Sequence, residues 1–147
     1  MDKIDKMIIN MLQENARATI SEMSSKVSLS MPAISERVKK LEDSGIIKQY
    51  TAIINPKYMN KNIEALIMIR FDNIKDEDGF REYAKTEIEI QECVVMTGIF
   101  NYCIKVITEN TENLEALVAK IKEKGANKLD VSLVLSTVVH KPTLKLA

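Results

Sequence analysis

The stretch TISEMSSKVSLSMPAISERVKKLEDSG, residues 19–45, decides the fold at the N-terminal end of the chain. It opens with Thr19 and, three residues later, Glu22. These two residues form a capping box, in which each side chain bonds the unpaired backbone amide of the other residue at a helix start. A short helix of about two turns is therefore predicted over residues 20–26.

A second helix is predicted after a turn of only four residues, 27–30. Ser30 is well placed to cap this helix, and Pro32 lies in its first turn, where a missing amide hydrogen does no harm. Gly45 follows as a left-handed C-cap. The inward face of the helix is expected to carry Ile34, Val38 and Leu41. Two helices joined by a tight turn are typical of a helix-turn-helix.

The flanking residues extend this pair to a winged helix-turn-helix. Residues 2–15 predict a preceding helix, because four apolar residues recur at i, i+4, i+7 and i+8 and so lie on one stripe. These residues are Ile4, Ile8, Met11 and Leu12. The run 46–54 is rich in β-branched residues and predicts a short hairpin or wing. Three helices followed by a wing complete the motif.

A domain boundary is expected at residues 55–62, which open with an Asn-Pro turn dipeptide and continue as a polar stretch. Residues 1–62 hold ten Lys and Arg against seven Asp and Glu, whereas residues 63–147 hold eleven against fourteen. The charge therefore changes sign at this point, which weakly supports a basic first module. We expect an N-terminal domain over 1–54, a linker over 55–62 and a second domain over 63–147.

The second domain is predicted to have an α+β, ferredoxin-like fold. Alternating apolar segments predict strands over 63–71, 90–97, 102–108 and 129–139. Helices are predicted over 77–88 and from Thr111 to a stop at Gly125. The resulting β-α-β-β-α-β order places two helices on one face of a four-stranded sheet.

The composition is that of an ordinary folded protein. Hydrophobic residues make up 46% of the chain and charged residues 29%, so enough apolar surface exists for a core and disorder is excluded as the main state. The N-terminal residues resemble neither a signal peptide nor a membrane span, so a cytoplasmic protein is expected. Cys93 and Cys103 lack CxxC spacing. We therefore expect them to pack in the core, with no metal and no cofactor.

Three segments carry a resemblance to a known family. They are IDKMIINMLQENAR at 4–17, LSMPAISERVKKLEDSGIIKQYTAIINP at 29–56 and MTGIFNYCIKV at 96–106. In this order and at this chain length they resemble the Lrp/AsnC family of leucine-responsive, or feast/famine, transcription regulators. The resemblance implies a winged helix that binds double-stranded DNA. It also implies a "regulation of amino-acid metabolism" domain that forms homodimers, often assembled into octamers, and that binds an amino acid or related small molecule.

The helix over 31–44 is then expected to lie in the major groove, with its N-terminal residues at base edges and basic side chains at phosphates. The DNA-binding candidates near its start are Ser30, Pro32, Ala33, Ser35 and Glu36, of which all but Pro32 are expected at bases. The phosphate candidates are Arg17, Arg37 and Lys40. Two alternatives stay open: the polar residues form a solvated helix face, or Arg37 packs its stem on the core.

The turn 98–102 is the expected effector site, because glycine lets a backbone amide approach a carboxylate closely. The resemblance also implies that members which bind amino acids use this region between dimers. The candidates are Gly98, Ile99, Phe100, Asn101 and Tyr102, with Ser136 and Thr137 on the last strand lining the same pocket. Family members commonly carry an acid where this chain has Asn101, so a charge partner for an α-amino group is missing. The alternative is a plain hairpin turn with glycine in a left-handed position.

Two other functions are alternatives to a regulator that responds to an effector. The siroheme decarboxylases resemble this family in both domains, but their chemistry uses histidines and arginines, and this chain has the single histidine His140. No Ser/His/Asp or Cys/His set and no glycine-rich phosphate loop is recognisable, so no enzyme is expected. An architectural DNA-binding protein without an effector is the second alternative, and the sequence does not separate it from the regulator.

Overall fold

The computed structural model describes residues 1–147 and divides the chain into two compact units. The first unit comprises Met1–Ile53 together with Val139–Ala147, and the second comprises Ile54–Val138. Each unit has its own cluster of buried apolar side chains. The last nine residues thus belong with the N-terminal unit, although their position in the sequence predicts the second domain.

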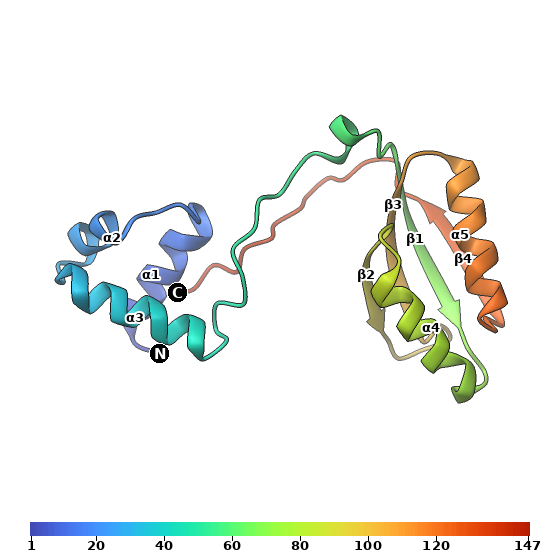
Figure 1. Ribbon diagram of the computed structural model, residues 1–147, viewed down its shortest axis with the longest axis horizontal. Coiled ribbons are helices and arrows are strands. Elements are labelled where there is room, and N and C mark those ends of the chain that lie inside the picture. The colour runs from blue at the N-terminus through green and yellow to red at the C-terminus, as the bar shows by residue number, and fades with distance from the viewer. The chain divides into compact units, whose positions relative to one another are not determined.

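The first unit contains three helices: α1 (Lys3–Glu14), α2 (Ile20–Val27) and α3 (Met31–Asp43) (Figure 1). The capping box of Thr19 and Glu22 forms at the start of α2, and Ser30 caps α3, as predicted. Ser28 adopts a left-handed conformation, with φ +56° and ψ +42°, and closes α2. The chain can therefore turn within a few residues and begin α3, which confirms the helix-turn-helix.

One side chain from each helix meets in the centre of this unit. Ile8 of α1 and Ile34 of α3 are fully buried, and Met23 of α2 is 1% exposed. Fully burying side chains of this size stabilises a fold by about 1.5–3 kcal/mol each. The three helices are therefore fixed relative to one another by shared core residues.

No strand or hairpin forms over residues 46–54, so the predicted wing is not present in the structure. Gly45, at φ +74°, ends the helical region, and the amide of Ile47 donates to the carbonyl of Leu41 at 3.0 Å. The chain then continues without pairing to another strand. A β-strand needs a partner for its backbone groups, and the β-branched residues of this run supply none.

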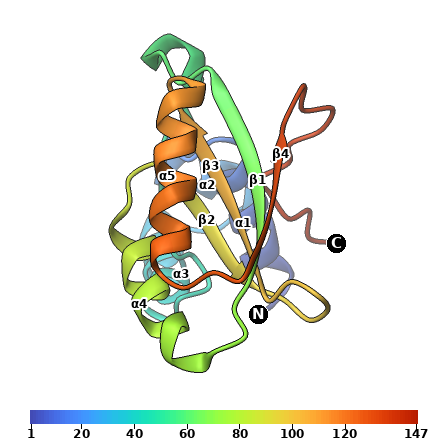
Figure 2. The same cartoon turned by 90° about the vertical axis from the view of Figure 1, so that its right-hand side faces the viewer.

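The second unit has a four-stranded antiparallel sheet in the order β2-β3-β1-β4. The strands are β1 (Ile63–Arg70), β2 (Ile90–Val95), β3 (Tyr102–Thr108) and β4 (Lys128–Leu133). A short 3-10 helix, η1 (Pro56–Met59), precedes β1; helices α4 (Ile74–Thr86) and α5 (Thr111–Glu123) follow β1 and β3. Both α-helices lie on the same face of the sheet (Figure 2). The predicted β-α-β-β-α-β order is confirmed.

The core of the second unit lies between this sheet and its two helices. Ile67 of β1 pairs with Ile104 of β3, and both side chains are fully buried beneath the helices. Three aromatic rings, those of Phe71, Phe80 and Tyr102, pack with centroids 5.0–5.7 Å apart. The two pairs that include Tyr102 are edge-to-face, a geometry that adds about 0.5–1.5 kcal/mol per pair beyond area burial.

Two predicted boundaries differ from the structure by three residues or more. Helix α4 begins three residues before the predicted start, because the side chain of Asn73 caps it by accepting a hydrogen bond from Lys75 N. Strand β4 ends at Leu133 and not at residue 139, because its partner β1 begins at Ile63 and the last ladder bond runs from Val134 N to Glu64 O. None of the helices combines the length and the apolar character that a membrane span requires.

Candidate nucleic-acid interface and effector loop

Helix α3 presents an exposed polar face opposite its buried one. Ile34 and Leu41 point into the core, at 0% and 4% exposure. The 100° step between helix residues places the exposed side chains on the other side. They are Pro32, Ser35, Glu36, Lys39 and Lys40, with Ala33 half-buried at the border. The structure therefore brings the predicted base-contact candidates together on one surface.

The first turn of α3 is exposed to solvent and is capped by Ser30. The Ser30 hydroxyl accepts a hydrogen bond from Ala33 N at 3.4 Å, and Pro32 has no amide hydrogen. The backbone dipoles of a helix give this end a partial positive charge, which favours phosphate groups. Met31 is 51% exposed here, although its apolar side chain gave no sequence signal for a surface role. An exposed apolar group at a helix tip suits contact with a thymine methyl group.

Arg37 forms ion pairs within the first unit, and its side chain is 32% exposed. Its Nη1 lies 2.7 Å from a carboxylate oxygen of Asp2 and 2.7 Å from one of Asp5. These hydrogen bonds raise the pKa of the Arg37 guanidinium. The pKa of Asp2 is lowered, first by the backbone amide of Asp5 and next by Arg37. Arg37 thus ties α3 to the start of α1, a role that neither predicted alternative describes.

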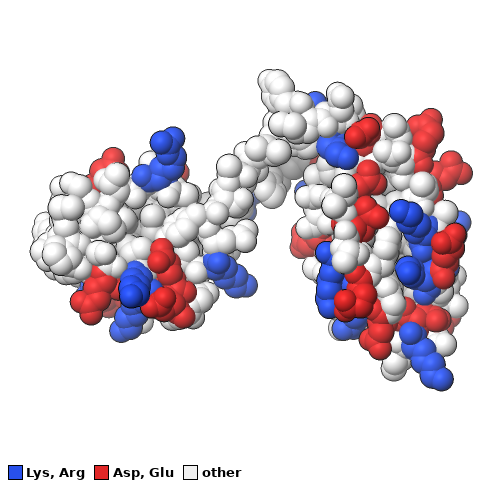
Figure 3. All heavy atoms as spheres, in the orientation of Figure 1, with Lys and Arg blue, Asp and Glu red and all other residues white.

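Three cations near the exposed face of α3 or at an adjacent turn form no ion pair. Arg17 lies exposed between α1 and α2, and Lys39 and Lys40 are exposed on α3. In Figure 3, Lys and Arg side chains lie next to Asp and Glu side chains along the α3 edge of the first unit. This edge of the first unit therefore carries charges of both signs. Any attraction to DNA phosphates there comes from the cations that form no ion pair.

The loop 98–101 between β2 and β3 is held by Asn101. Its side-chain amide accepts a hydrogen bond from Phe71 N and donates one to Phe71 O, both at 2.9 Å. Gly98 has φ +111°, a conformation that side chains rarely allow, and Ile99 is 66% exposed. Asn101 therefore positions the loop, and Gly98 and Ile99 are the parts open to a ligand.

Tyr102, predicted to face the effector, is buried at 1% exposure and belongs to the core. Its hydroxyl donates to Glu77 Oε2 at 2.7 Å and accepts from Arg81 Nε at 2.6 Å. Burial is the first cause of its raised pKa, and the hydrogen bond to Glu77 the second. As the first residue of β3 its side chain points to the helix face, so it does not reach a ligand at the loop.

Ser136 and Thr137 lie far from this loop within one chain. The loop is attached at the Arg70 end of β1, where Asn101 N donates to Ile69 O. Ser136 and Thr137 follow β4 beyond the Ile63 end of β1, after the bond from Val134 N to Glu64 O. At roughly 3.3 Å per strand residue, the two ends are more than about 16 Å apart. A single chain therefore does not place both sets of residues around one pocket.

Three charged residues beside the loop were missed from the sequence. Arg70 Nη1 donates to Ile99 O at 3.3 Å, and Arg70 Nε lies 2.6 Å from Asp72 Oδ1. Lys128, the register partner of Arg70 on β4, has its Nζ 5.4 Å from the centroid of the Phe100 ring. Arg70 and Lys128 come from different strands, so only the sheet register brings them together. With Asp72 they supply charges of both signs next to the loop.

The prediction that both cysteines pack in the core is wrong. Cys93 is exposed and Cys103 is half-buried, because β2 is an edge strand and the Cys103 side of β3 has no helix over it. Burial still raises the pKa of both thiols. No group of three or more His, Cys, Asp or Glu side chains is arranged to hold a metal ion.

A helix-turn-helix with an exposed second helix, followed by a separate α+β unit, is typical of a DNA-binding protein with a second domain. Comparisons with known proteins agree. Residues 1–48 match the model for winged helix-turn-helix DNA-binding domains, and residues 64–144 match the Lrp/AsnC ligand-binding domain. The chain belongs to the Lrp/AsnC family of transcription regulators.

Individual relatives support the same family. The chain is 34% identical to the transcriptional regulator FL11 of Pyrococcus abyssi, over 99% of this chain and 95% of that protein. It is 32% identical to LrpC of Bacillus subtilis, over 82% and 83%. These relatives are transcriptional regulators, so the family does not support the alternative of a decarboxylase-like enzyme.

Solved structures match the whole chain. The regulator NMB0573 of Neisseria meningitidis, crystallised with L-Met, has a TM-score of 0.91 at 28% identity and covers 98% of this chain and 96% of its own. The structure of LrpC from Bacillus subtilis has a TM-score of 0.87 at 29% identity, with 96% and 99% covered. The protein is thus a DNA-binding transcription regulator with a C-terminal domain of the ligand-binding type.

Proposed function

We propose that the protein binds specific DNA sequences through α3, which enters the major groove with its exposed face toward the bases. Ser30, Ala33, Ser35 and Glu36 contact base edges, and Pro32 packs against the groove. Arg17 and Lys40 contact phosphates, whereas Arg37 holds α3 in place. The observation that carries this proposal is the exposed polar face of α3 opposite the buried Ile34 and Leu41.

We propose further that the protein forms homodimers through the sheet face that carries no helix. This face exposes apolar side chains: Leu66 and Val94 are each 40% exposed, and Met68, Cys103 and Ile107 are half-buried. A contiguous apolar surface on a soluble domain is typical of an interface. The ion pair of Glu64 and Lys105, at 3.0 Å, lies on the same face and adds polar specificity. Assembly of dimers into octamers is what the family resemblance implies.

The effector we propose is an amino acid bound beside the loop 98–101. Arg70 and Lys128 suit a carboxylate, and Asp72 suits an α-ammonium group in place of the family's acid at residue 101. The relative crystallised with L-Met shows that a protein of this fold binds such a ligand. Ser136 and Thr137 join the site only if a second copy supplies them.

A screen with free amino acids tests the effector proposal. The thermal midpoint of the purified protein is measured with each of the twenty amino acids at millimolar concentration. A true ligand raises the midpoint by mass action, and Arg70→Ala abolishes the rise. No rise with any amino acid would instead favour an architectural DNA-binding protein that responds to concentration alone.

Selection of bound fragments from genomic DNA, with and without the stabilising amino acid, tests the DNA proposal. We expect a recurring sequence with half-sites spaced by about one helical turn or a multiple of it, as a symmetric dimer requires. Fragments that share no sequence would contradict specific binding. Because the protein must reach DNA, we infer a cytoplasmic location.

A further inference from the structure

We propose that α1 carries a recognition site for an extended peptide, and that residues 142–147 of the same chain are its occupant. These residues lie in the first unit although they follow the second unit in the sequence. The sites of contact are two side-chain amides on α1, those of Asn10 and Gln13. This binding site is separate from the DNA-contacting face of α3 and from the loop 98–101.

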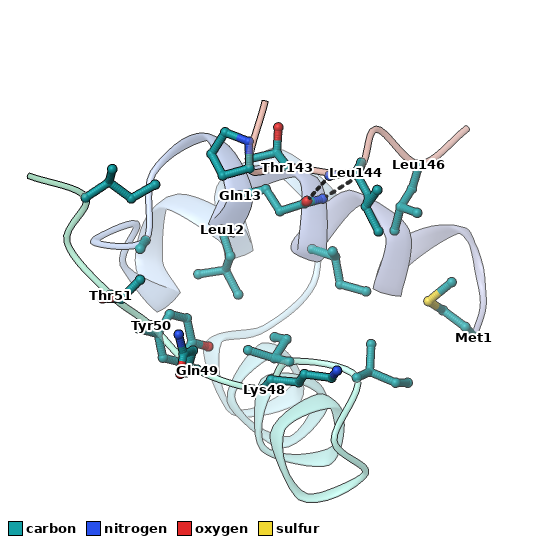
Figure 4. Close-up of a pocket in the computed structure, with 16 residues that line it drawn as sticks. Met1, Leu12, Gln13, Lys48, Gln49, Tyr50, Thr51, Thr143, Leu144 and Leu146 are labelled. Atoms are coloured by element: carbon teal, nitrogen blue, oxygen red, sulfur yellow. Dashed lines mark hydrogen bonds between the residues drawn. The ribbon is translucent and has the colours of Figure 1, made fainter. Parts of the chain in front are cut away.

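Each amide bonds both backbone groups of one residue. Gln13 Nε2 donates to Leu144 O at 2.7 Å, and Leu144 N donates to Gln13 Oε1 at 2.6 Å. Asn10 Nδ2 donates to Leu146 O at 2.9 Å, and Leu146 N donates to Asn10 Oδ1 at 3.2 Å. Figure 4 shows the Gln13 side chain directed toward Leu144, with both of its bonds dashed. The amides thus bind the peptide as the edge of a neighbouring strand would.

The spacing of residues on α1 matches the spacing of backbone groups along the extended segment 142–147. In an extended chain, residues i and i+2 turn their backbone groups to the same edge, as Leu144 and Leu146 do here. On a helix, residues three and four apart lie on one face, as Lys6, Asn10 and Gln13 do. Lys6 Nζ extends the row by donating to Ala147 O at 2.7 Å. One face of α1 therefore matches the peptide edge at Leu144 and Leu146 and also bonds the last residue.

Apolar packing fixes the register of the peptide. The Leu146 side chain packs against the core cluster of the first unit, whereas Leu144 remains 77% exposed. The peptide also closes one side of a cavity of about 600 Å³, whose other walls include Leu12 and Tyr50 (Figure 4). A slip by one residue would turn Leu146 away from the core and present the wrong backbone edge.

Docking of this segment gives the DNA-binding unit a second attachment. The chain passes between the two units at residues 53–54 and again at 138–139. A bound segment therefore restricts the first unit at two points, which lowers the entropy lost when two such units must bind one DNA molecule. This consequence, unlike the peptide site itself, rests on the proposed function.

The peptide site is tested with a chain truncated after Lys141 and the synthetic peptide PTLKLA. We expect chemical-shift changes confined to α1 and residues 46–53, saturating at millimolar peptide, since tethering supplies an effective concentration of about that size. The same peptide N-methylated at both leucine amides should not bind, because it lacks the two donors. Equal binding of both peptides, or binding of neither, would overturn the proposal.

Amide hydrogen exchange tests the site in the full chain. In Asn10→Ala/Gln13→Ala the amides of Leu144 and Leu146 should exchange at least about tenfold faster than in the control Lys3→Ala, which alters an exposed α1 residue outside the site. Equal rates in both variants would contradict the site. A second measurement mixes two differently labelled copies of the protein. If contacts between residues 142–147 and α1 are seen only between different copies, the occupant comes from a second copy and the same-chain assignment is overturned.

DNA binding tests the second attachment. Truncation after Lys141 should lower affinity for DNA with two half-sites several-fold and leave affinity for a single half-site unchanged. If both affinities stay unchanged, the attachment has no effect on DNA binding. If the unaltered protein binds no DNA at all, the proposed function fails, while the peptide and exchange experiments still decide the recognition site.

Discussion

The guanidinium of Arg37 on α3 lies 2.7 Å from a carboxylate oxygen of Asp5 on α1, and equally close to Asp2. Asp2 and Asp5 also cap α1 by bonding each other's backbone amides at 3.0 and 2.8 Å. The same two carboxylates therefore start one helix and anchor the next. Because α3 carries the proposed DNA-contacting face, this anchor sets where that face lies relative to the rest of the unit.

Substitution of Arg37 and substitution of Lys40 are expected to affect DNA binding and thermal stability differently. Lys40→Ala should reduce the slope of log affinity against log salt concentration by about 0.9, the value for one lost phosphate contact. Arg37→Ala should leave that slope unchanged and lower the thermal midpoint, because it breaks the link between α1 and α3. Titrations at several salt concentrations with melting curves measure both. A flattened slope in Arg37→Ala would show that Arg37 contacts phosphate after all.

Acid should weaken the same link. The pKa of Asp2 lies below its ordinary value of 3.8 in the folded protein, so Asp2 binds a proton more readily when the chain is unfolded. The ionised Asp2 carboxylate therefore contributes fully to the free energy of unfolding at pH values above 3.8. This contribution is lost as the pH falls through the lowered pKa of the folded protein. Melting curves from about pH 5 downward should show a shallower decline for Asp2→Asn than for the unaltered protein. Parallel declines would contradict a role for the Asp2 carboxylate.

Gly125 is expected to tolerate no side chain. It has φ +96°, and a Cβ there would lie 2.6–2.9 Å from the side chain of Asp76. Gly125→Ala should lower the free energy of unfolding by about 1–3 kcal/mol. The control Gly79→Ala, in α4 with open space around it, should raise it by up to about 1 kcal/mol. Urea unfolding measures both, and a neutral Gly125→Ala would show that the close approach is readily relieved.

Asn101→Asp should destabilise the second unit although it restores the acid common in the family. The new carboxylate can still accept from Phe71 N but would face Phe71 O without a proton to donate, at a cost of about 1–2 kcal/mol. Asn127→Asp is the matched control, because Asn127 only accepts, from Asp72 N. Equal free energies of unfolding for the two variants would disprove the donor role of Asn101.

The sequence predicted those parts of the fold that short-range signals encode. Thr19, Glu22 and Ser30 lie within a few residues of the groups they cap, so the helix-turn-helix was visible in the order of residues. The alternation along β1 and β3 likewise revealed the sheet. Local patterns of this kind are determined by backbone geometry and burial alone.

Features that depend on distant residues were not predicted. Arg37 and Asp2 are 35 residues apart, and Gln13 and Leu144 are 131 apart. No periodicity marks such pairs, because each partner lies on a different element. The separation of Ser136 from Gly98 has the same origin, since only the sheet register assigns them to opposite ends of β1.

The most direct test of DNA binding by α3 compares the double variant Ser35→Ala/Glu36→Ala, on the exposed face of α3, with Lys3→Ala/Glu14→Ala, on exposed positions of α1. Affinity for a selected DNA fragment is measured by fluorescence anisotropy alongside the thermal midpoint. We predict that the α3 variant loses affinity at least about tenfold at an unchanged midpoint, as one or two lost base contacts require, while the α1 variant binds as before. Unchanged affinity in the α3 variant would contradict α3 as the element that enters the DNA groove.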